Sequence, residues 1–408
     1  MPNMVDALAT PSCRDFLLSD ADRAFRAQVH EVLARELQPR AGAIENDGDW
    51  AALRDALRAV GQNGLLKLMF AELYEGPVAE PGLRHATLLS EEAASINYAF
   101  ETTLASAISA AHTLHRYGRP AVKEGYLAGL LDASRIGAIC VTEPGAGSDT
   151  SRLRTRVCCD EAHGEWVVDG TKRYISNASV ADVYIVYGVE GLDGLARRRL
   201  NVVAVPADCR GIAFPARYTF MGRRGCMVGE VRFDNCRVSA DHLLDQPGAG
   251  MRVMRSMFNF ERVILAGASL GVARSAFELA LEHARTRMAF GSLLATKQLT
   301  WNRLAEMRWR LDAAELLTYR AALLYDAGTS DKELAQSAAM AKLVASETAT
   351  YCADAAVQIL GGDGLTKQYG RCEQIYRDAR ALPIVGGTSE MARYLIASAD
   401  LPNVRLDL

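Results

Sequence analysis

The sequence of 408 residues has no long uninterrupted apolar run and no strong excess of charge of either sign. Its most apolar helical stretch, around residues 99–111, contains Glu101 and is too short to cross a bilayer. The first residues lack the basic and apolar regions of a signal peptide. With a formal net charge of -3, no overall field attracts nucleic acid. We therefore expect a cytoplasmic protein that binds neither membranes nor nucleic acid.

Clusters of basic or metal-binding residues are also scarce. The basic runs at residues 197–199 and 223–224 are short and lack interleaved aromatic residues, which is typical of a solvated turn or a contact to one anionic group. The nine cysteines are scattered, and Cys158 and Cys159 are adjacent. Since no Cys/His set has zinc spacing, we expect reduced thiols and no metal site.

The periodicity of apolar residues changes twice along the chain. It is helical from about residue 20 to 131, two-fold from about 136, and helical again from 251. A chain of this length exceeds one hydrophobic core. We therefore predict a mostly α protein with three domains: a helical domain at 1–135, a central β domain at 136–247 and a helical bundle at 248–408.

Individual elements can be predicted within these regions. Long amphipathic helices are expected at 251–287, 296–327 and 332–360. The segment 165–176 has Asp169-Gly170 at its centre, which predicts two strands joined as a hairpin.

Glu261 occupies a position where a carboxylate is costly. Apolar residues recur every three or four positions through 251–273, and Glu261 falls on that helix face, directly before Arg262. Burial disfavours the ionised carboxylate and raises its pKa, which makes it a usable base near neutral pH. We therefore interpret Glu261 as a candidate catalytic base; the alternative is an incidental Glu–Arg pair on the helix surface.

Two glycine-containing segments could bind ligands. In residues 139–149 a strand enters Pro144-Gly-Ala-Gly147, a loop that exposes backbone N–H groups and could hold a phosphate or the edge of a ring. In residues 386–390 a Gly-Gly turn precedes Thr388 and Ser389, either of which can cap a helix; a free helix N-terminus there would bind an anion or polarise a carbonyl. Each is also an ordinary turn or cap, and no Rossmann fingerprint is present.

Six motifs in this order resemble the acyl-CoA dehydrogenase family. They are Val141-Thr-Glu-Pro-Gly-Ala-Gly-Ser-Asp149, Gly170-Thr-Lys-Arg-Tyr-Ile-Ser176, Arg287-Met-Ala-Phe-Gly291 with Gln298, Val357-Gln-Ile-Leu-Gly-Gly362, Arg377-Asp378 and Gly387-Thr-Ser-Glu390. The resemblance extends over about residues 20–399. It implies an N-terminal helical domain, a β-barrel-like domain, a C-terminal four-helix bundle, one FAD per subunit and a homotetramer built as a dimer of dimers.

The resemblance also implies roles for individual residues. It places Ile139, Val141, Thr142, Gly147, Ser148, Tyr174 and Ser176 against the flavin; Arg287, Phe290, Gln298, Gln358 and Gly362 against the FAD of a neighbouring subunit; and Thr388 and Glu390 as further FAD contacts. Ser148, Arg262, Gly386 and Gly387 match substrate-contact positions. Tyr174 and Ser176 stand where many members have Trp and Thr, and they keep a ring and a hydroxyl.

One departure from the family pattern concerns the base. Many members carry a catalytic glutamate directly before the last Gly-Thr, where this chain has Gly386. The isovaleryl-CoA and long-chain branches place the base on the long helix before an arginine, which Phe260-Glu261-Arg262 matches. The small residue at 386 also predicts open space there, and hence tolerance of a bulky or branched acyl group.

The resemblance implies α,β-dehydrogenation of an acyl thioester. Glu261 would take the α-proton while a hydride passes from Cβ to flavin N5. A ribityl hydroxyl and the backbone N–H of Gly386 would stabilise the charge that develops on the carbonyl oxygen. The acyl group would be held by coenzyme A or by an acyl or peptidyl carrier protein, and electrons would pass to an electron-transfer flavoprotein.

Two alternatives share the fold. One is a flavin-dependent oxidase or monooxygenase, a class in which the glutamate base is often absent. The other is a non-catalytic flavin-binding relative.

Overall fold

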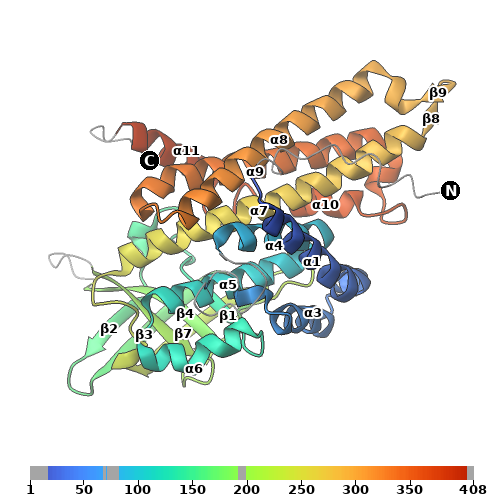
Figure 1. Cartoon of the computed structure of the whole chain (residues 1–408). Helices are drawn as coiled ribbons and strands as arrows, with labels where there is room; N and C mark the ends of the chain where they lie inside the picture. The colour runs from blue at the N-terminus through green and yellow to red at the C-terminus, as the bar shows by residue number, and fades with distance from the viewer. Residues whose placement is uncertain (1–16, 68–69, 71–81, 192–198, 402–408) are drawn as a thin grey trace.

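The structure, a computed structural model, describes residues 17–67, 70, 82–191 and 199–401. An N-terminal group of helices, a central curled sheet and a C-terminal group of long helices follow one another along the chain (Figure 1). This arrangement confirms the predicted fold class. Arg197 and Arg198 of the first basic run lie outside the described residues.

The N-terminal helices supply a buried layer in the middle of the molecule. They are α1 (Asp20–Glu36), α2 (Ala41–Asp47), α3 (Trp50–Gln62), α4 (Leu83–Ile96), α5 (Tyr98–Tyr117) and α6 (Pro120–Leu131). Asn97 caps α5 by accepting a hydrogen bond from the backbone N–H of Phe100. Nearly all residues of α4 and α5 are buried. Helix α4 packs on α7, and α5 contacts both α7 and β1, so these two helices join the sheet to the C-terminal helices.

The central sheet has seven strands. They are β1 (Gly137–Cys140), β2 (Arg156–Asp160), β3 (Glu165–Ser176), β4 (Val183–Glu190), β5 (Arg199–Pro206), β6 (Ile212–Ala213) and β7 (Val228–Ser239). Their order is β1-β4-β2-β3-β7-β6, with β5 also paired to β4. Strands β1 and β4 are parallel, with Ile139 opposite Ile185, whereas β4 and β5 are antiparallel.

The hairpin predicted within residues 165–176 is wrong. These residues form the single strand β3, which pairs with β2 and with β7. A different hairpin joins β2 to β3, and the turn of that hairpin contains Gly164 at φ +67°. Gly170 marks an irregularity in the β3–β7 register, and a Cβ there would lie 2.8 Å from Cα of Thr155. Glycine is therefore required at 170 by a close backbone neighbour and not by a turn.

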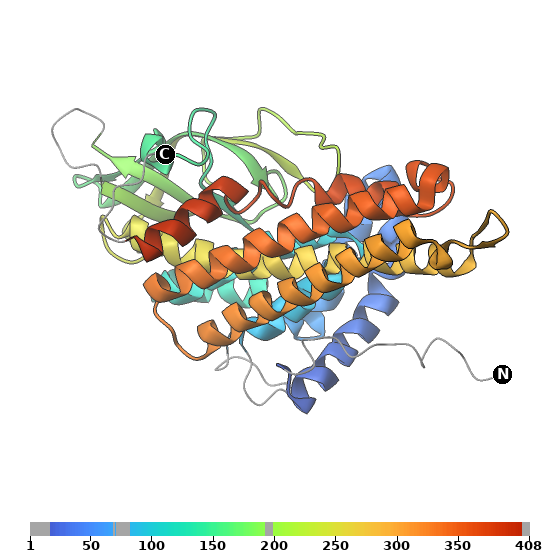
Figure 2. The same ribbon diagram turned by 90° about the horizontal axis from the view of Figure 1, so that it is seen from above.

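The C-terminal region is built from long helices. Its elements are α7 (Gly250–Thr286), β8 (Met288–Ala289), β9 (Ser292–Leu293), α8 (Gln298–Asp326), α9 (Asp331–Leu360), α10 (Cys372–Ala379) and α11 (Ser389–Asp400). Short 3-10 turns occur at Gln38–Arg40, Leu65–Lys67, Thr150–Arg152, Ala240–His242, Leu294–Thr296 and Gly361–Leu365. The three predicted long helices are present, with ends shifted by one or two residues. Figure 2 shows the long helices side by side, with the β8–β9 hairpin at one end and α11, in dark red, close to the sheet.

Helix α7 lies in the middle of this packing. It is long and apolar enough to cross a membrane, but 78% of its most apolar window is buried inside the protein, as in a core helix. Two of its glycines face α4. A Cβ at Gly271 would lie 2.1 Å from the carbonyl oxygen of Glu91, and one at Gly267 would lie 2.7 Å from that of Thr87. The backbones of α4 and α7 therefore touch at these glycines.

A methyl group at the α4–α7 contact should destabilise the fold. Gly271→Ala places Cβ against a backbone carbonyl, so we expect the free energy of unfolding to fall by about 2 kcal/mol or more. Gly125→Ala in α6 is the matched control, because nothing lies within 4 Å of a Cβ there. Its greater helix propensity should raise stability by about 0.5–1 kcal/mol. Denaturant unfolding of both variants measures the difference, and equal stabilities would contradict the close contact.

Candidate active site

Glu261 lies in the first third of α7 and is partly exposed. It makes no hydrogen bond or ion pair with any other residue in the described part of the chain. Burial of the carboxylate among protein atoms raises its pKa to about 7, although the positive charges of Arg262 and Lys342 act in the opposite direction. An unpaired carboxylate that titrates near neutral pH is available to accept a proton.

Arg262 extends from α7 toward the turn before α11. Its Nη1 donates to Oδ1 of Asn259 over 3.2 Å, and its guanidinium lies 5.5 Å from the centre of the Phe258 ring. Burial lowers the pKa of Arg262 to about 10, so it stays charged at neutral pH. A Cβ at Gly387 would lie 3.9 Å from Nη2 of Arg262. The arginine therefore borders the Gly386–Gly387 turn.

The Gly386–Gly387 turn has no open space at residue 386. Both glycines have positive φ, +65° at Gly386 and +98° at Gly387. A Cβ at Gly386 would lie 2.3 Å from Cδ1 of Leu265, which stands one helical turn after Glu261. The prediction of open space at residue 386 is therefore wrong, whereas the tolerance of a bulky or branched acyl group stays a prediction. The side chain of Leu265, on the helix that carries Glu261, fills the space that a side chain at residue 386 would occupy.

Lys342 of α9 is the third member of a charged group with Glu261 and Arg262. It was not predicted from the sequence. Only 1% of the residue is exposed, and its Nζ donates to the carbonyl oxygen of Gly387 over 2.6 Å. Burial and the nearby Arg262 lower the pKa of Lys342 to about 8. The signal was present in the sequence, because Lys342 interrupts the Ala338–Ala345 run just as Glu261 interrupts the apolar face of α7.

A second buried carboxyl lies beneath α7. Glu101 of α5 is fully buried and accepts a hydrogen bond of 2.5 Å from Ser90, whose hydroxyl is also 3.1 Å from the carbonyl oxygen of Ile264. Burial raises the pKa of Glu101 to about 8, and the negative charge of Glu261 adds to the rise. Glu101 is therefore mostly protonated at neutral pH, which limits repulsion between the two carboxyls.

The glycine loop after β1 is fixed by a buried ion pair. Nζ of Lys172 lies 2.8 Å from Oε1 of Glu143 and 2.9 Å from the carbonyl oxygen of Val141. The carboxylate of Glu143 also accepts from the backbone N–H groups of Arg154 and Thr155. Although burial opposes ionisation, Lys172 and these donors hold the pKa of Glu143 below its ordinary value. The loop geometry is therefore set by an ion pair between Glu143 of the 141–149 motif and Lys172 of the 170–176 motif.

The loop faces open space beside an exposed ring. Nothing lies within 4 Å of a Cβ at Gly145 or Gly147, and Ser148 is exposed. The backbone N–H of Arg173 donates to the carbonyl oxygen of Thr142, which places Tyr174 next to the loop. Tyr174 has φ +58° and is 50% exposed. Backbone N–H groups, hydroxyls and the half-exposed ring of Tyr174 thus border one open region.

The predicted flavin contacts on β1 and β3 lie around this region. Ile139 and Ser176 are partly exposed, whereas Val141 is buried in the same apolar cluster as Val253, Met254 and Met257 of α7. Tyr187 of β4 also belongs to this cluster, and burial together with the charge of Glu261 raises its pKa. One apolar cluster therefore connects β1 and β4 to the first turns of the helix that carries Glu261.

A second group of predicted cofactor residues lies far from Glu261. Arg287, Phe290, Gln298, Gln358 and Gly362 are exposed and belong to the ends of α7, α8 and α9 that meet at the β8–β9 hairpin. Arg287 follows Glu261 by 26 positions along α7 and its C-cap, which corresponds to about 39 Å. Within one chain Arg287 is therefore far from the candidate base. The contact of these residues with the FAD of a neighbouring subunit stays a prediction.

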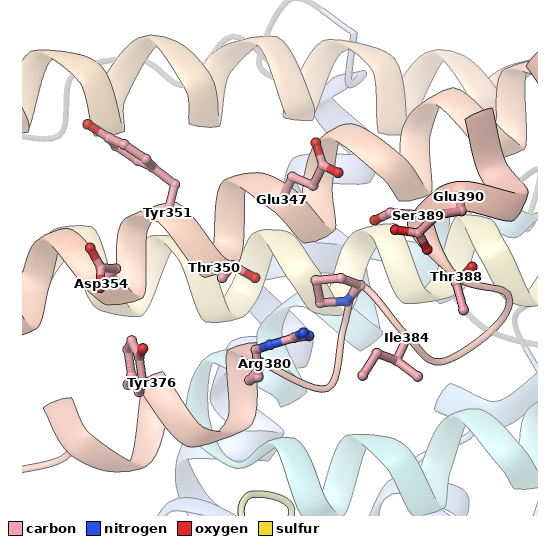
Figure 3. A pocket seen from close by; sticks show the side chains of 11 residues that line it. Glu347, Thr350, Tyr351, Asp354, Tyr376, Arg380, Ile384, Thr388, Ser389 and Glu390 are labelled. Carbon is pink, nitrogen blue, oxygen red and sulfur yellow. The ribbon is translucent and has the colours of Figure 1, made fainter.

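Thr388 and Glu390 border a hollow beside α9. Its volume is about 560 Å³, and its lining also includes Arg380 and Tyr376 of the α10 end and Tyr351 of α9. Figure 3 shows Arg380 along the floor of the hollow, between Tyr376 and Ile384. Sequence analysis named Thr388 and Glu390 but not the other lining residues, because they come together only after α10 turns back onto α9.

The N-terminus of α11 is not free. The Thr388 hydroxyl caps the helix by accepting from the backbone N–H of Met391 over 3.3 Å. Hydrogen bonds from the backbone N–H of Glu390 itself and from Thr388 lower the pKa of the Glu390 carboxyl. The first turn of α11 therefore already contains a carboxylate, whose charge the helix dipole favours.

Comparisons with known proteins identify the family. Residues 19–134, 138–236 and 248–400 match the N-terminal, middle and C-terminal domain models of acyl-CoA dehydrogenase. A probable acyl-CoA dehydrogenase of Bacillus subtilis, YngJ, is 31% identical over 384 residues, which are 94% of this chain and 98% of that protein. Glutaryl-CoA dehydrogenase of Desulfococcus multivorans is 29% identical over 384 residues, or 94% and 97% of the two chains.

Solved structures show the same relationship. Butyryl-CoA dehydrogenase of Megasphaera elsdenii superimposes with a TM-score of 0.87 at 28% identity, covering 94% of this chain and 99% of that one. The chain therefore belongs to the acyl-CoA dehydrogenase family, whose members are FAD-containing oxidoreductases that act on CH–CH groups. This membership confirms the resemblance and the enzyme class expected from the six motifs.

Breaking the buried pair under the glycine loop should disturb the site. Lys172→Met leaves the Glu143 carboxylate buried without its cation, so we expect stability to fall by about 3–5 kcal/mol and FAD to be lost on purification. Arg237→Met is the control, because Arg237 pairs with Asp160 and Glu165 at the surface of the same sheet. Its loss should cost about 1 kcal/mol or less. Thermal unfolding and the ratio of visible to ultraviolet absorbance measure both effects; retention of FAD by Lys172→Met would contradict the role of the pair.

Proposed function

We propose that the protein catalyses FAD-dependent α,β-dehydrogenation of an acyl thioester, with Glu261 as the base that removes the α-proton. The observation that carries the proposal is the unpaired carboxylate of Glu261, titrating near neutral pH beside two cations and a glycine turn. Gly386 cannot accept a proton, so Glu261 takes the role that other members give to residue 386.

The residues around the open region fit a flavin. The half-exposed Tyr174 ring, which also contacts Arg173 and Tyr218, offers an aromatic surface, while Thr142, Ser148 and Ser176 offer hydroxyls for a ring edge or a phosphate. Gly145 and Gly147 leave space that side chains would fill. When bound, FAD supplies the oxidant that accepts the β-hydrogen as a hydride. An electron-transfer flavoprotein is the proposed electron acceptor.

The charged group on α7 and α9 suits the chemistry of an acyl thioester. Removal of the α-proton leaves negative charge on the thioester oxygen, and a backbone N–H donor there is worth roughly 3 kcal/mol. The Gly386–Gly387 turn is bordered by Arg262 and Lys342, whose positive charges favour such an oxyanion. Ser148 and Arg262 are the proposed substrate contacts on the two sides of the site.

A second subunit would use the distant residues. We propose a homotetramer in which Arg287, Phe290 and Gln298 of one subunit contact the FAD of another. Phe290 is 99% exposed at the hairpin tip. Helix α8 adds the exposed apolar side chains of Leu299, Trp301, Trp309 and Leu316. Large exposed apolar surfaces of this kind are typical of protein–protein interfaces.

The acyl group and its carrier remain to be assigned by experiment. Relatives named for butyryl-CoA and glutaryl-CoA favour a short acyl group on coenzyme A. Leu265 at the Gly386 turn favours the same size class, because it occupies space that a branched chain would need. An anaerobic titration with straight, branched and dicarboxylic acyl-CoAs and with carrier-bound acyl groups, followed by bleaching of the visible flavin band, distinguishes these substrates.

Neutralising the base should separate binding from catalysis. Glu261→Gln keeps the size of the side chain but cannot accept a proton, so we expect normal FAD content and a loss of bleaching by at least about 10³-fold. Glu278→Gln, an exposed position on the same helix, should behave as wild type. Bleaching of Glu261→Gln at the normal rate would disprove the assignment of the base. A wild-type protein that no thioester bleaches would disprove the proposed function.

The bleaching rate should depend on pH through Glu261. The carboxylate acts only when deprotonated, and its pKa is raised to about 7. The rate at low substrate concentration should therefore be small at pH 5.5, rise through about pH 7 and level off above it. Stopped-flow measurements from pH 5.5 to 9 record this profile. A rate that is already constant above pH 5.5 would mean that a group with an ordinary carboxyl pKa is the base.

A further inference from the structure

Lys342 is an ammonium group in an unusual place. It projects from α9 (Asp331–Leu360) into the interior, where 1% of the residue is exposed. Within the described part of the chain its ammonium group makes one hydrogen bond, the 2.6 Å contact to the carbonyl oxygen of Gly387, although an ammonium group has three donors. Burying a cation with one neutral acceptor is unfavourable. Such a residue requires an explanation beyond packing.

The hydrogen bond anchors a turn that has no side chains of its own. Gly386 and Gly387 both adopt positive φ, and glycines lose more conformational freedom on folding than other residues. The turn is closed by a hydrogen bond from the Ser389 N–H to the Pro383 carbonyl oxygen. The carbonyl of Gly387 is the point at which Lys342 connects this turn to the rigid helix α9. The N–H of Gly386 belongs to the same turn, two peptide units before this carbonyl.

The positive charge of Lys342 on α9 also acts on the Glu261 carboxyl on α7. Several charged or titratable groups influence the pair: Arg262 on α7, Glu347 on α9, Glu390 on α11, Glu101 on α5 and Tyr187 on β4. Burial favours the protonated form of Glu261, whereas Arg262 and Lys342 favour the carboxylate. Removing one of the two cations should therefore raise the pKa of Glu261 further, because less positive charge opposes the effect of burial.

We propose that Lys342 is a positioning residue of this site, which holds the Gly386–Gly387 turn against α9 and supplies a positive charge that favours the carboxylate form of Glu261. The inference rests on the proposed function, because Glu261 must act as the base. It adds a residue from a third helix to the group on α7 and the turn. The two roles, anchor and charge, can be separated by substitution.

Two variants separate these roles. Lys342→Gln keeps an N–H donor for Gly387 but removes the charge, so the midpoint of the bleaching profile should move up by about one pH unit with a near-normal limiting rate. Lys342→Met removes both, so the midpoint should rise equally and the limiting rate should fall about tenfold as the turn loosens. The control is Lys332→Gln, an exposed position on the same helix, which should leave the midpoint and the rate unchanged.

A second measurement does not depend on turnover. Infrared difference spectra recorded against pH, with Glu261→Gln as the reference, follow the protonated carboxyl of Glu261 in each folded variant. The protonated band should persist to about one pH unit higher in Lys342→Gln than in wild type. Folded Lys342→Gln with wild-type midpoints in both experiments would overturn the inference while leaving the proposed function intact. A wild type that no thioester bleaches, yet with the infrared shift in Lys342→Gln, would overturn only the proposed function.

Discussion

The contact between α7 and its neighbours is the constraint on which the rest of the structure depends. One helix packs against α4 and α5 on one side and against α8 and α9 on another, and its first turns contact the sheet. Gly267 and Gly271 let the backbone of α4 come close enough to touch it. Because Glu261 stands on this helix, the position of the candidate base is fixed by the core of three regions at once.

Charge balance is the second constraint. Protein atoms surround most of Glu261, Arg262 and Lys342, and this burial shifts the pKa of each group in the direction that favours its neutral form. A lone buried carboxylate would simply protonate. Arg262 on α7 and Lys342 on α9 oppose this protonation, so that the pKa of Glu261 lies near neutral pH. Glu101, mostly protonated, adds little negative charge. The arrangement suits a base that must change protonation state during each turnover.

The sequence predicted much of this, for physical reasons that differ between residues. Glu261 could be found because a charge on an apolar helix face violates the helical period, which is a local property. The glycine loop after β1 could be found because its motif contains Glu143, one half of the ion pair that fixes it. The hairpin at Asp169-Gly170 was wrong, because a glycine between alternating residues has the same local pattern whether it turns the chain or admits the neighbouring strand at Thr155.

The sequence by itself determined the order of helical and β regions, the motifs and the choice of Glu261 as the candidate base, since these depend on periodicity and residue type over short spans. The tertiary structure decided what surrounds the base. Leu265 fills the space beside Gly386, Lys342 reaches the carbonyl of Gly387, and Glu101 approaches from α5. Residues separated by 45 to 160 positions meet there through packing alone, and no local pattern encodes the distance between them.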